Sequence, residues 1–414
     1  MASISSFIFY IFVFMSVYVQ VFFLVTFLEN RKKIFIRTGE VKLAKYPAVT
    51  IIVPCFNEEK TVYKTIRSLF EMNYPKDKLK IFLVDDGSTD GTSNIIYKFA
   101  KYKNVRVFNK ENGGKYTALN LGLKHVETDF LGCLDADSFA DRESLVRLMS
   151  YFEKDPQIMA VAPSIIASSE DKIIQKAQKA EYHMGVYTKK MLGFLGAINV
   201  TPGPLTIFRK KVFDDLGPYR HAHNTEDMEI AYRMQINHYK IAHCNDAYVY
   251  TNTPETIKKL YRQRLRWIYG FINNTLDYKS VLFKRKYGNF ALFTLPTGII
   301  TIFSVGFVFG RIVYNIGDFL YSRFTNFQLV GFNPSLESYF FDPFFINVKV
   351  SIFLMMAIYL IVFFAIIYGA RMYDGKWKFS MEVIYFFPVF LFIAPFWILK
   401  AIWNTVSSRP PAWR

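Results

Sequence analysis

The sequence predicts an α/β domain joined to α-helical transmembrane segments. Hydrophobic residues make up 52% and aromatic residues 18% of the 414 residues, whereas charged residues make up 21%. Several apolar runs have the length of membrane-spanning helices. Between residues 45 and 250, short β-rich runs alternate with amphipathic helical patterns. This alternation is typical of a parallel sheet covered by helices.

Four apolar runs without Asp, Glu, Lys or Arg divide the chain into parts. They cover residues 7–28, 290–310, 350–370 and 383–399, and a helix needs about 20 such residues to span hydrocarbon. No basic residue precedes the first run, and it is too long for a secretory signal, so we expect an uncleaved anchor. The expected parts are a transmembrane anchor in 1–30, an α/β domain with its associated helices in 45–275, and three transmembrane helices in 288–405.

The distribution of Lys and Arg predicts the orientation in the membrane. The bases beside the first run and between the third and fourth runs are Arg31, Lys32, Lys33, Arg371, Lys376 and Lys378. Loops rich in such residues remain cytosolic, so the middle domain should face the cytosol and the N-terminus the outside. Segment 317–343 contains one base, Arg323, and three acids, which suits an outer loop. The C-terminal bases, among them Lys400, do not fit this scheme.

Acidic or Gly-rich segments follow three of the expected strands. The strand candidates are residues 49–53, 80–84, 105–108, 130–134 and 158–162. Asn57-Glu58 follows the first, Asp85-Asp86-Gly87-Ser88 the second and Asp135-Ala136-Asp137 the fourth. Open α/β sheets bind ligands at the carboxyl ends of parallel strands, so these segments are candidate site residues.

Two further helices have an apolar stripe beside many basic residues. They cover residues 173–191 and 257–271. Basic amphipathic helices can lie in the headgroup region of a membrane. The alternative is that they are ordinary helices packed on the domain.

Asp135 and Asp137 form a candidate metal site. Two clustered carboxylates repel one another unless a cation lies between them, and hard oxygen ligands suit Mg²⁺ or Mn²⁺ bridging a diphosphate. The alternative is a solvated turn or a cap for a helix over residues 141–152.

The segments around Asp85-Asp86 and Lys115 are candidates for binding a nucleotide. A carboxylate of the first can accept hydrogen bonds from a base or ribose, although the same residues also make a good turn and helix cap. Gly113-Gly114-Lys115 precedes an expected helix over 116–126. A helix N-terminus and a lysine favour phosphate.

Two later motifs complete the series. Thr225-Glu226-Asp227 starts an expected helix, where an acid is either an ordinary first-turn residue or a general base. Gln263-x-x-Arg266-Trp267 is the more specific pattern, because its Gln and Arg donors can hold a diphosphate and its indole can stack on a sugar ring.

In this order the motifs resemble the membrane-embedded family 2 glycosyltransferases with a GT-A (Rossmann-like) fold, which include hyaluronan, chitin, cellulose and poly-N-acetylglucosamine synthases. The resemblance covers about residues 47–270. It implies that Asp227 is the base, that Asp135 and Asp137 bind the metal, and that Lys115 and Arg266 offset leaving-group charge. Implied nucleotide-sugar residues are Pro54, Glu58, Asp85, Asp86, Lys115 and Asp135; implied catalytic residues are Asp227, Glu226, Arg266, Trp267 and Gln263.

We therefore expect an inverting, Mg²⁺- or Mn²⁺-dependent membrane enzyme that extends a β-linked polysaccharide from a UDP-sugar. Because four spans are few for a secretion channel, a homodimer or an export partner is one expectation. A lipid glycosyltransferase of the ceramide glucosyltransferase kind, which adds one sugar, is the alternative. The net charge of +17 fits nucleic acid as well, but much of it flanks the membrane runs, so we expect membrane lipids and no nucleic acid as partners.

Overall fold

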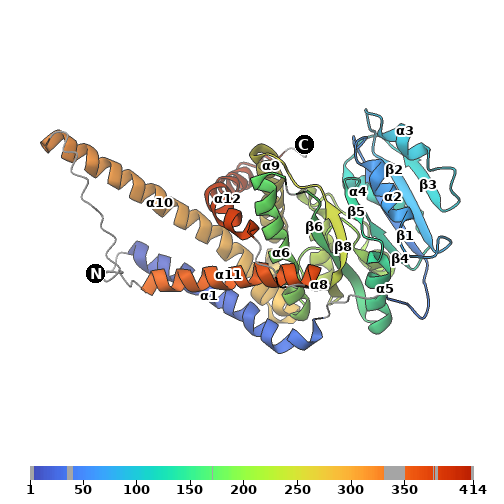
Figure 1. Ribbon diagram of the computed structural model, residues 1–414, viewed down its shortest axis with the longest axis horizontal. Coiled ribbons are helices and arrows are strands. Elements are labelled where there is room, and N and C mark those ends of the chain that lie inside the picture. Colours follow the sequence, from blue (N-terminus) through green and yellow to red (C-terminus); the bar gives the residue numbers. More distant parts are fainter. Residues whose placement is uncertain are drawn as a thin grey trace.

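The computed structural model describes residues 4–34, 41–169, 171–330, 350–375, 377 and 381–411. An α/β domain lies at one end of the molecule, and long helices extend away from it (Figure 1). The eight strands of the described residues form one mixed sheet in the order β3-β2-β1-β4-β7-β6-β8-β5. They are β1 (Val49–Cys55), β2 (Leu79–Asp85), β3 (Val105–Asn109), β4 (Phe130–Cys133), β5 (Ser138–Ala140), β6 (Ile158–Ala167), β7 (Ile207–Arg209) and β8 (Lys240–Thr251).

All five predicted strands are present, and four of them form the parallel half of the sheet. β1 pairs in parallel with β2 and β4, and β2 with β3. The seven residues of β1 are all buried, as expected for a strand covered on both faces. The carboxyl ends of β2, β1 and β4 therefore lie side by side.

The other half of the sheet is mixed, so the parallel pairing that the sequence predicts holds there only between β6 and β8. β7 runs antiparallel to β4 and β6, and β5 runs antiparallel to β8. The sequence did not indicate β5 and β7 because a strand of three residues has too few positions for a periodic pattern. In β8, the polar run His243 to Asp246 interrupts the apolar pattern.

Helices cover both faces of the sheet and confirm both amphipathic patterns. The α-helices are α2 (Val62–Phe70), α3 (Thr92–Tyr97), α4 (Lys115–Lys124), α5 (Ser144–Lys154), α6 (Ile173–Phe194), α7 (Lys211–Leu216), α8 (Glu226–Ile236) and α9 (Ile257–Asp277). Short 3-10 helices cover Arg31–Lys33, Ala222–Asn224, Lys279–Val281 and Arg285–Tyr287, and a π-helix covers Phe290–Thr294.

Four helices of the described residues are long and apolar enough to cross a membrane, which confirms the four predicted spans. They belong to α1 (Ile4–Asn30), α10 (Leu295–Val330), α11 (Val350–Asp374) and α12 (Glu382–Val406). The predicted outer loop 317–343 is wrong at its start, because α10 continues as a helix to Val330. Residues 331–349 and the orientation residues Lys376 and Lys378 lie outside the described residues.

Two apolar clusters join the α/β domain to the long helices. One contains sheet residues together with residues of α1, α6 and α11, such as Phe27, Tyr187 and Tyr368. The other joins α8, α9, α10 and α12 and includes Tyr232 and Trp397. The elements that carry the candidate site are thus packed against the candidate membrane spans.

Candidate functional site

The candidate nucleotide residues lie at the ends of β1 and β2. Pro54 and Cys55 pair with Val84 and Asp85 in the sheet register, so Glu58, three residues beyond Cys55, follows the same edge. Ser88 donates a backbone hydrogen bond to Asp85 (N to Oδ1, 3.0 Å), which closes a turn after β2. The Ser88 hydroxyl of this turn accepts a hydrogen bond from the Asn57 amide at 3.1 Å, which joins the segments after the two strands.

Asp86 organises the loop in front of α4. Its Oδ1 accepts hydrogen bonds from the Lys110 ammonium at 2.5 Å and the Gly113 amide at 3.1 Å. Its Oδ2 accepts from the Gly114 amide at 2.9 Å. Gly114 has a φ of 89°, in the region that favours glycine. The carboxylate therefore fixes the loop from which Lys115 starts.

Asp135 and Asp137 follow β4 and form an acidic group with Glu58. Burial, followed by repulsion from Asp135 and Glu58, raises the pKa of Asp137 to about 6. This is the behaviour expected of carboxylates crowded in a partly buried place. Within the part of the chain that the structure describes, no three His, Cys, Asp or Glu side chains are grouped so as to hold a metal ion.

Lys115 connects the acidic strand end to the start of α8. Its ammonium lies 2.6 Å from Asp135 Oδ1 and 3.2 Å from Glu226 Oε1. Although burial acts in the opposite direction, these carboxylates hold its pKa well above the usual value. A Cβ on Gly203 would lie 2.7 Å from the Lys115 nitrogen and 3.0 Å from Asp135 Oδ2. The chain at Gly203 thus passes directly over this ion pair.

Asp227 lies in the first turn of α8 and is held through its backbone. The carbonyl of Asp227 accepts hydrogen bonds from the Thr201 hydroxyl at 2.8 Å and the Thr201 amide at 3.1 Å. Burial and the neighbouring Glu226 raise the pKa of Asp227 to about 6, whereas the charges of Lys115 and Arg266 act to lower it. A carboxyl group with this pKa can accept a proton near neutral pH.

The motif on α9 is arranged around Arg264, which the sequence analysis missed as a site residue. Its guanidinium donates to Gln263 Oε1 at 2.7 Å and lies 4.1 Å from the centre of the Trp267 ring. It also forms an ion pair with Glu181 of α6. Gln263 and Trp267 therefore contact a buried arginine in this structure, and that arginine connects α9 with α6.

The structure brings most of the predicted residues to one edge of the sheet. Asp135, Lys115 and Glu226 are in direct contact, and the charges of Arg266 and Asp135 act on Asp227. Besides those of Arg264, the sequence did not indicate the contacts made by Thr201, Gly203 and Glu181. These residues are brought to the site by distant segments, so a local pattern could not have identified them.

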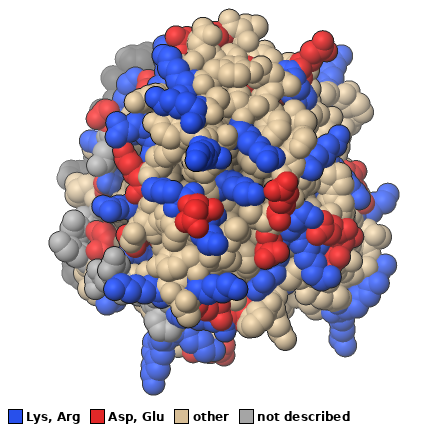
Figure 2. Space-filling model, turned by 90° about the vertical axis from the view of Figure 1, so that its right-hand side faces the viewer, with Lys and Arg blue, Asp and Glu red and all other residues tan. Residues whose placement is uncertain are grey.

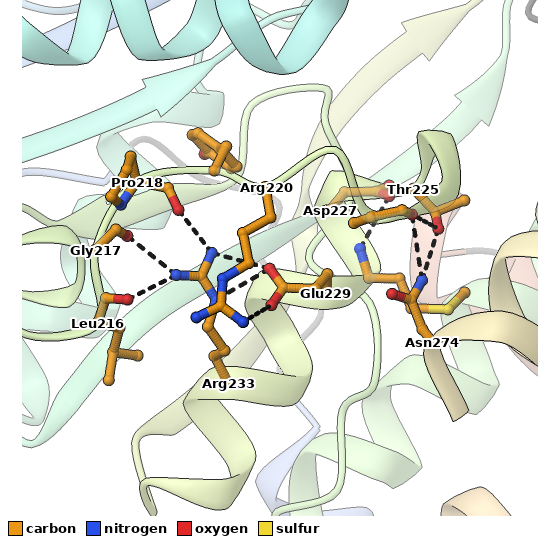
Figure 3. A network of polar contacts seen from close by, with 12 residues as sticks. Leu216, Gly217, Pro218, Arg220, Thr225, Asp227, Glu229, Arg233 and Asn274 are labelled. Carbon is orange, nitrogen blue, oxygen red and sulfur yellow. Dashed lines mark hydrogen bonds and ion pairs between the residues drawn. The ribbon is translucent and has the colours of Figure 1, made fainter. Parts of the chain in front are cut away.

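The rest of α8 is clamped by a buried ion pair (Figure 3). Arg233 lies 2.9 Å from Glu229 Oε2 and donates to the carbonyls of Leu216, Gly217 and Pro218. Glu229 also accepts from the Tyr278 hydroxyl at 2.7 Å. The helix that carries Asp227 is therefore fixed to the preceding loop and to the segment after α9.

A family model described as "Glycosyl transferase family 2" matches residues 50–217. Residues 50–217 are thus similar to a family 2 glycosyltransferase domain. The match includes the acids after β1, β2 and β4 and ends before Thr225, so the base candidate and the α9 motif lie beyond the matched residues. The expectation of a GT-A-like α/β sheet with apolar helices is confirmed.

Curated relatives share about half of their length with this chain. A poly-β-1,6-N-acetyl-D-glucosamine synthase of Staphylococcus epidermidis is 32% identical over 224 residues, 54% of each chain. One of Staphylococcus aureus is 30% identical over 233 residues, 56% of each. The structure is similar to a mannosyltransferase of Pyrobaculum calidifontis solved with GDP-Man and Mn²⁺, at a TM-score of 0.61 and 15% identity. That similarity covers 96% of this chain and 99% of the other and shows the fold.

The α/β domain carries basic residues on its outer face. Figure 2 views the end of the molecule opposite the long helices, where Lys and Arg are spread over the surface and alternate with Asp and Glu. Mixed charges of this kind keep a surface soluble.

Proposed function

We propose that the protein is a membrane-bound, inverting glycosyltransferase that transfers a sugar from a UDP-sugar to a growing β-linked polysaccharide. The observation that carries the proposal is the grouping of Asp135, Lys115, Glu226 and Asp227 at the edge of a family 2 glycosyltransferase sheet. Four apolar helices attached to this domain support a membrane enzyme. The lysines and arginines beside the first span support a cytosolic site. The names of the curated relatives make UDP-N-acetylglucosamine the first donor to test.

In this proposal the ends of β1 and β2 bind the nucleotide. Pro54, Glu58 and the Asp85-Asp86 pair would line the base and ribose, with Asp86 holding the Gly113-Gly114 loop in place. Lys115 would exchange part of its contact with Asp135 for the diphosphate. Arg266 would add a second positive charge on the side of α9.

Asp227 is proposed as the general base. It would accept the proton of the acceptor hydroxyl while the hydroxyl oxygen attacks the anomeric carbon from the face opposite UDP. The carbon–oxygen bond to UDP breaks as the new bond forms, so one displacement inverts the anomeric centre. The close Glu226 raises the pKa of Asp227, which makes it a stronger base than an exposed aspartate. Gln263 and Trp267 would line the acceptor side.

The donor set fits a divalent cation that is shared with the substrate. Asp135 and Asp137 would hold Mg²⁺ or Mn²⁺, and the raised pKa of Asp137 reflects carboxylates that repel one another. Two carboxylates leave most positions of such an ion open, so diphosphate oxygens and water would supply the rest. When bound, the cation would offset the charge of the leaving diphosphate.

The test uses the purified full chain in lipid, with Mg²⁺ or Mn²⁺ and a panel of UDP-sugars. UDP release and product size are measured for the wild type, for Asp227→Asn, and for Asp77→Asn as a control at an exposed acid. We expect Asp227→Asn to lose about 10²- to 10⁴-fold in kcat and Asp77→Asn to retain activity. Transfer at the wild-type rate by Asp227→Asn would exclude Asp227 as the base.

Product length and metal removal test the remaining parts. A high-mass product supports a polysaccharide synthase, whereas a single sugar on an extractable lipid would replace it with the lipid glycosyltransferase. Chelation by EDTA should stop UDP release, and added Mg²⁺ or Mn²⁺ should restore it. Undiminished release in EDTA would refute metal dependence.

A further inference from the structure

Directly before the proposed base, the backbone is strained. Ala222, His223 and Asn224 have φ values of 46°, 53° and 63°. Residues with side chains rarely adopt this region, and three in succession persist only where the surrounding structure holds them. Thr225 and Glu226 follow at once, so the path of this segment determines where Asp227 lies.

A relay of hydrogen bonds from α9 holds the segment. The Asn274 amide donates to Thr225 Oγ1 at 2.8 Å, and the Thr225 hydroxyl donates to the Ala222 carbonyl at 2.8 Å (Figure 3). Thr225 occupies the N-cap position of α8, yet its side chain makes no cap hydrogen bond. The hydroxyl therefore serves the strained segment instead of the helix end.

The residues of α9 that contact this segment lie along one stripe of the helix. A Cβ on Gly270 would lie 2.4 Å from both Oγ1 and Cγ2 of Thr225, so the helix backbone lies directly against this side chain. Asn274 is completely buried, and Asp277 lies 2.8 Å from His223 Nε2. Positions 270, 274 and 277 follow the helical spacing of four and three and continue the line of Gln263, Arg266 and Trp267.

We propose that Asn274 and Thr225 are positioning residues: through the Ala222 carbonyl they fix Asp227 relative to the Gln263, Arg266 and Trp267 motif on the same helix. The inference rests on the proposed function, because it assigns to Asp227 the role of base. It adds that α9 contributes twice to the candidate site: through the motif Gln263, Arg266 and Trp267, and through the stripe of positions 270, 274 and 277. A helix movement on substrate binding would then carry both groups together.

Three substitutions in the full chain in lipid test the relay. Thr225→Val keeps the shape and removes the hydroxyl, Thr225→Ser keeps the hydroxyl, and Asn274→Leu removes the donor. Asn273→Leu is the matched control, because the Asn273 amide bonds Thr405 of α12 on a different side of α9 at 3.0 Å. For each protein, kcat, the KM of the UDP-sugar, the Kd of UDP and the thermal midpoint are measured.

We expect Thr225→Val and Asn274→Leu to lower kcat about 10-fold or more, since small misplacements of a reacting group are costly. Their donor KM and UDP Kd should stay within about twofold, and Thr225→Ser and Asn273→Leu should keep kcat within about twofold. If Thr225→Val no longer binds UDP, we take it as unfolded. The inference is then judged on Asn274→Leu, by its loss of kcat at an unchanged donor KM and UDP Kd.

Unchanged kcat in the folded variants would overturn the inference. An equal loss of kcat in Asn273→Leu would also overturn it, since the effect would then be general destabilisation. Failure of the proposed function has a different signature, because the wild type would show no transfer or Asp227→Asn would be fully active. If the wild type is active and Asp227→Asn is inactive, the proposed function holds. The variants of Thr225 and Asn274 then test the relay alone.

Discussion

At the scale of single residues, the environment of Asp227 determines the pH range in which it could act as the proposed base. Its carboxyl group is buried beside Glu226, which raises the pKa to about 6, whereas Arg266 acts to lower it. A base must be deprotonated before it accepts a proton. Acid therefore removes the active form, and the charge of Arg266 extends the active range downward in pH.

We expect kcat/KM to fall as the pH drops below about 6. At pH 5, about a tenth of a group with a pKa of about 6 is deprotonated, so the rate should be about a tenth of its plateau. Arg266→Gln should move this acid limb to higher pH, because it removes a positive charge that stabilises the carboxylate. The measurement is UDP release between pH 4.5 and 8; a limb that shifts to lower pH in Arg266→Gln would contradict the assignment.

The acids of the site could be predicted, but their neighbours could not. Asp85 and Asp135 directly follow apolar strands, and this local pattern indicates a sheet edge. Arg264 is one of several bases on an amphipathic helix, and its contact with Glu181 depends on how α9 crosses α6. Asn274 resembles any polar residue of a helix until the strained segment beside it is known.

At the scale of elements, α6 and α11 approach one another closely at Gly369. A Cβ on Gly369 would lie 1.9 Å from the carbonyl oxygen of His183. Only glycine permits two helices to approach so closely. Since Glu181 of α6 pairs with Arg264, this contact connects a candidate membrane span to the helix that carries the site motif.

Gly369→Ala should therefore destabilise the protein, because the added methyl group must push the two backbones apart. Overpacking of this kind costs about 1–3 kcal/mol. Gly310→Ala is the control, since among the described residues its added Cβ meets nothing within 4 Å beyond its chain neighbours and the backbone of its own helix, and alanine favours helix by about 0.5–1 kcal/mol. Thermal midpoints in one detergent are compared. Equal midpoints for both variants would show that the helices can separate at Gly369 without loss.

The elements that the sequence predicted are those with enough residues to show a period. The strand over residues 49–53 and the helix over residues 173–191 were identified, whereas β5 and β7 were too short. The end of α10 was missed for a different reason. Arg311, Asp318 and Arg323 interrupt the apolar pattern, and charged residues indicate the end of a membrane run and not the end of a helix.

At the scale of the whole molecule, α10 is longer than a bilayer is thick. Its 36 residues extend about 54 Å at about 1.5 Å per residue, whereas the hydrocarbon core is about 30 Å. Figure 1 shows α10 leading away from the glycosyltransferase domain, with its far end at the side of the N-terminus. With a cytosolic domain, this end would project beyond the outer face of the membrane.

Site-specific labelling tests this orientation. Ser322 lies on the far part of α10 and is exposed, and Ser280 is exposed beside the glycosyltransferase domain. The three native cysteines are buried, and burial raises the pKa of the Cys55, Cys133 and Cys244 thiols, which leaves them unreactive. In intact cells, a membrane-impermeant maleimide should label Ser322→Cys, and should label Ser280→Cys only after permeabilisation. The opposite result would invert the proposed topology.

The apolar cluster shared by α8, α9, α10 and α12 connects the helices of the candidate site to two candidate membrane spans. Tyr232 on the helix of the proposed base and Trp397 on a candidate span belong to this cluster. A span tilts when its apolar length exceeds the local hydrocarbon thickness, and a tilt of α12 or α10 would press on α9 and on α8. Under the proposed function, the acyl-chain length of the lipid should therefore change the position of Asp227 relative to the α9 motif and, with it, the rate of transfer.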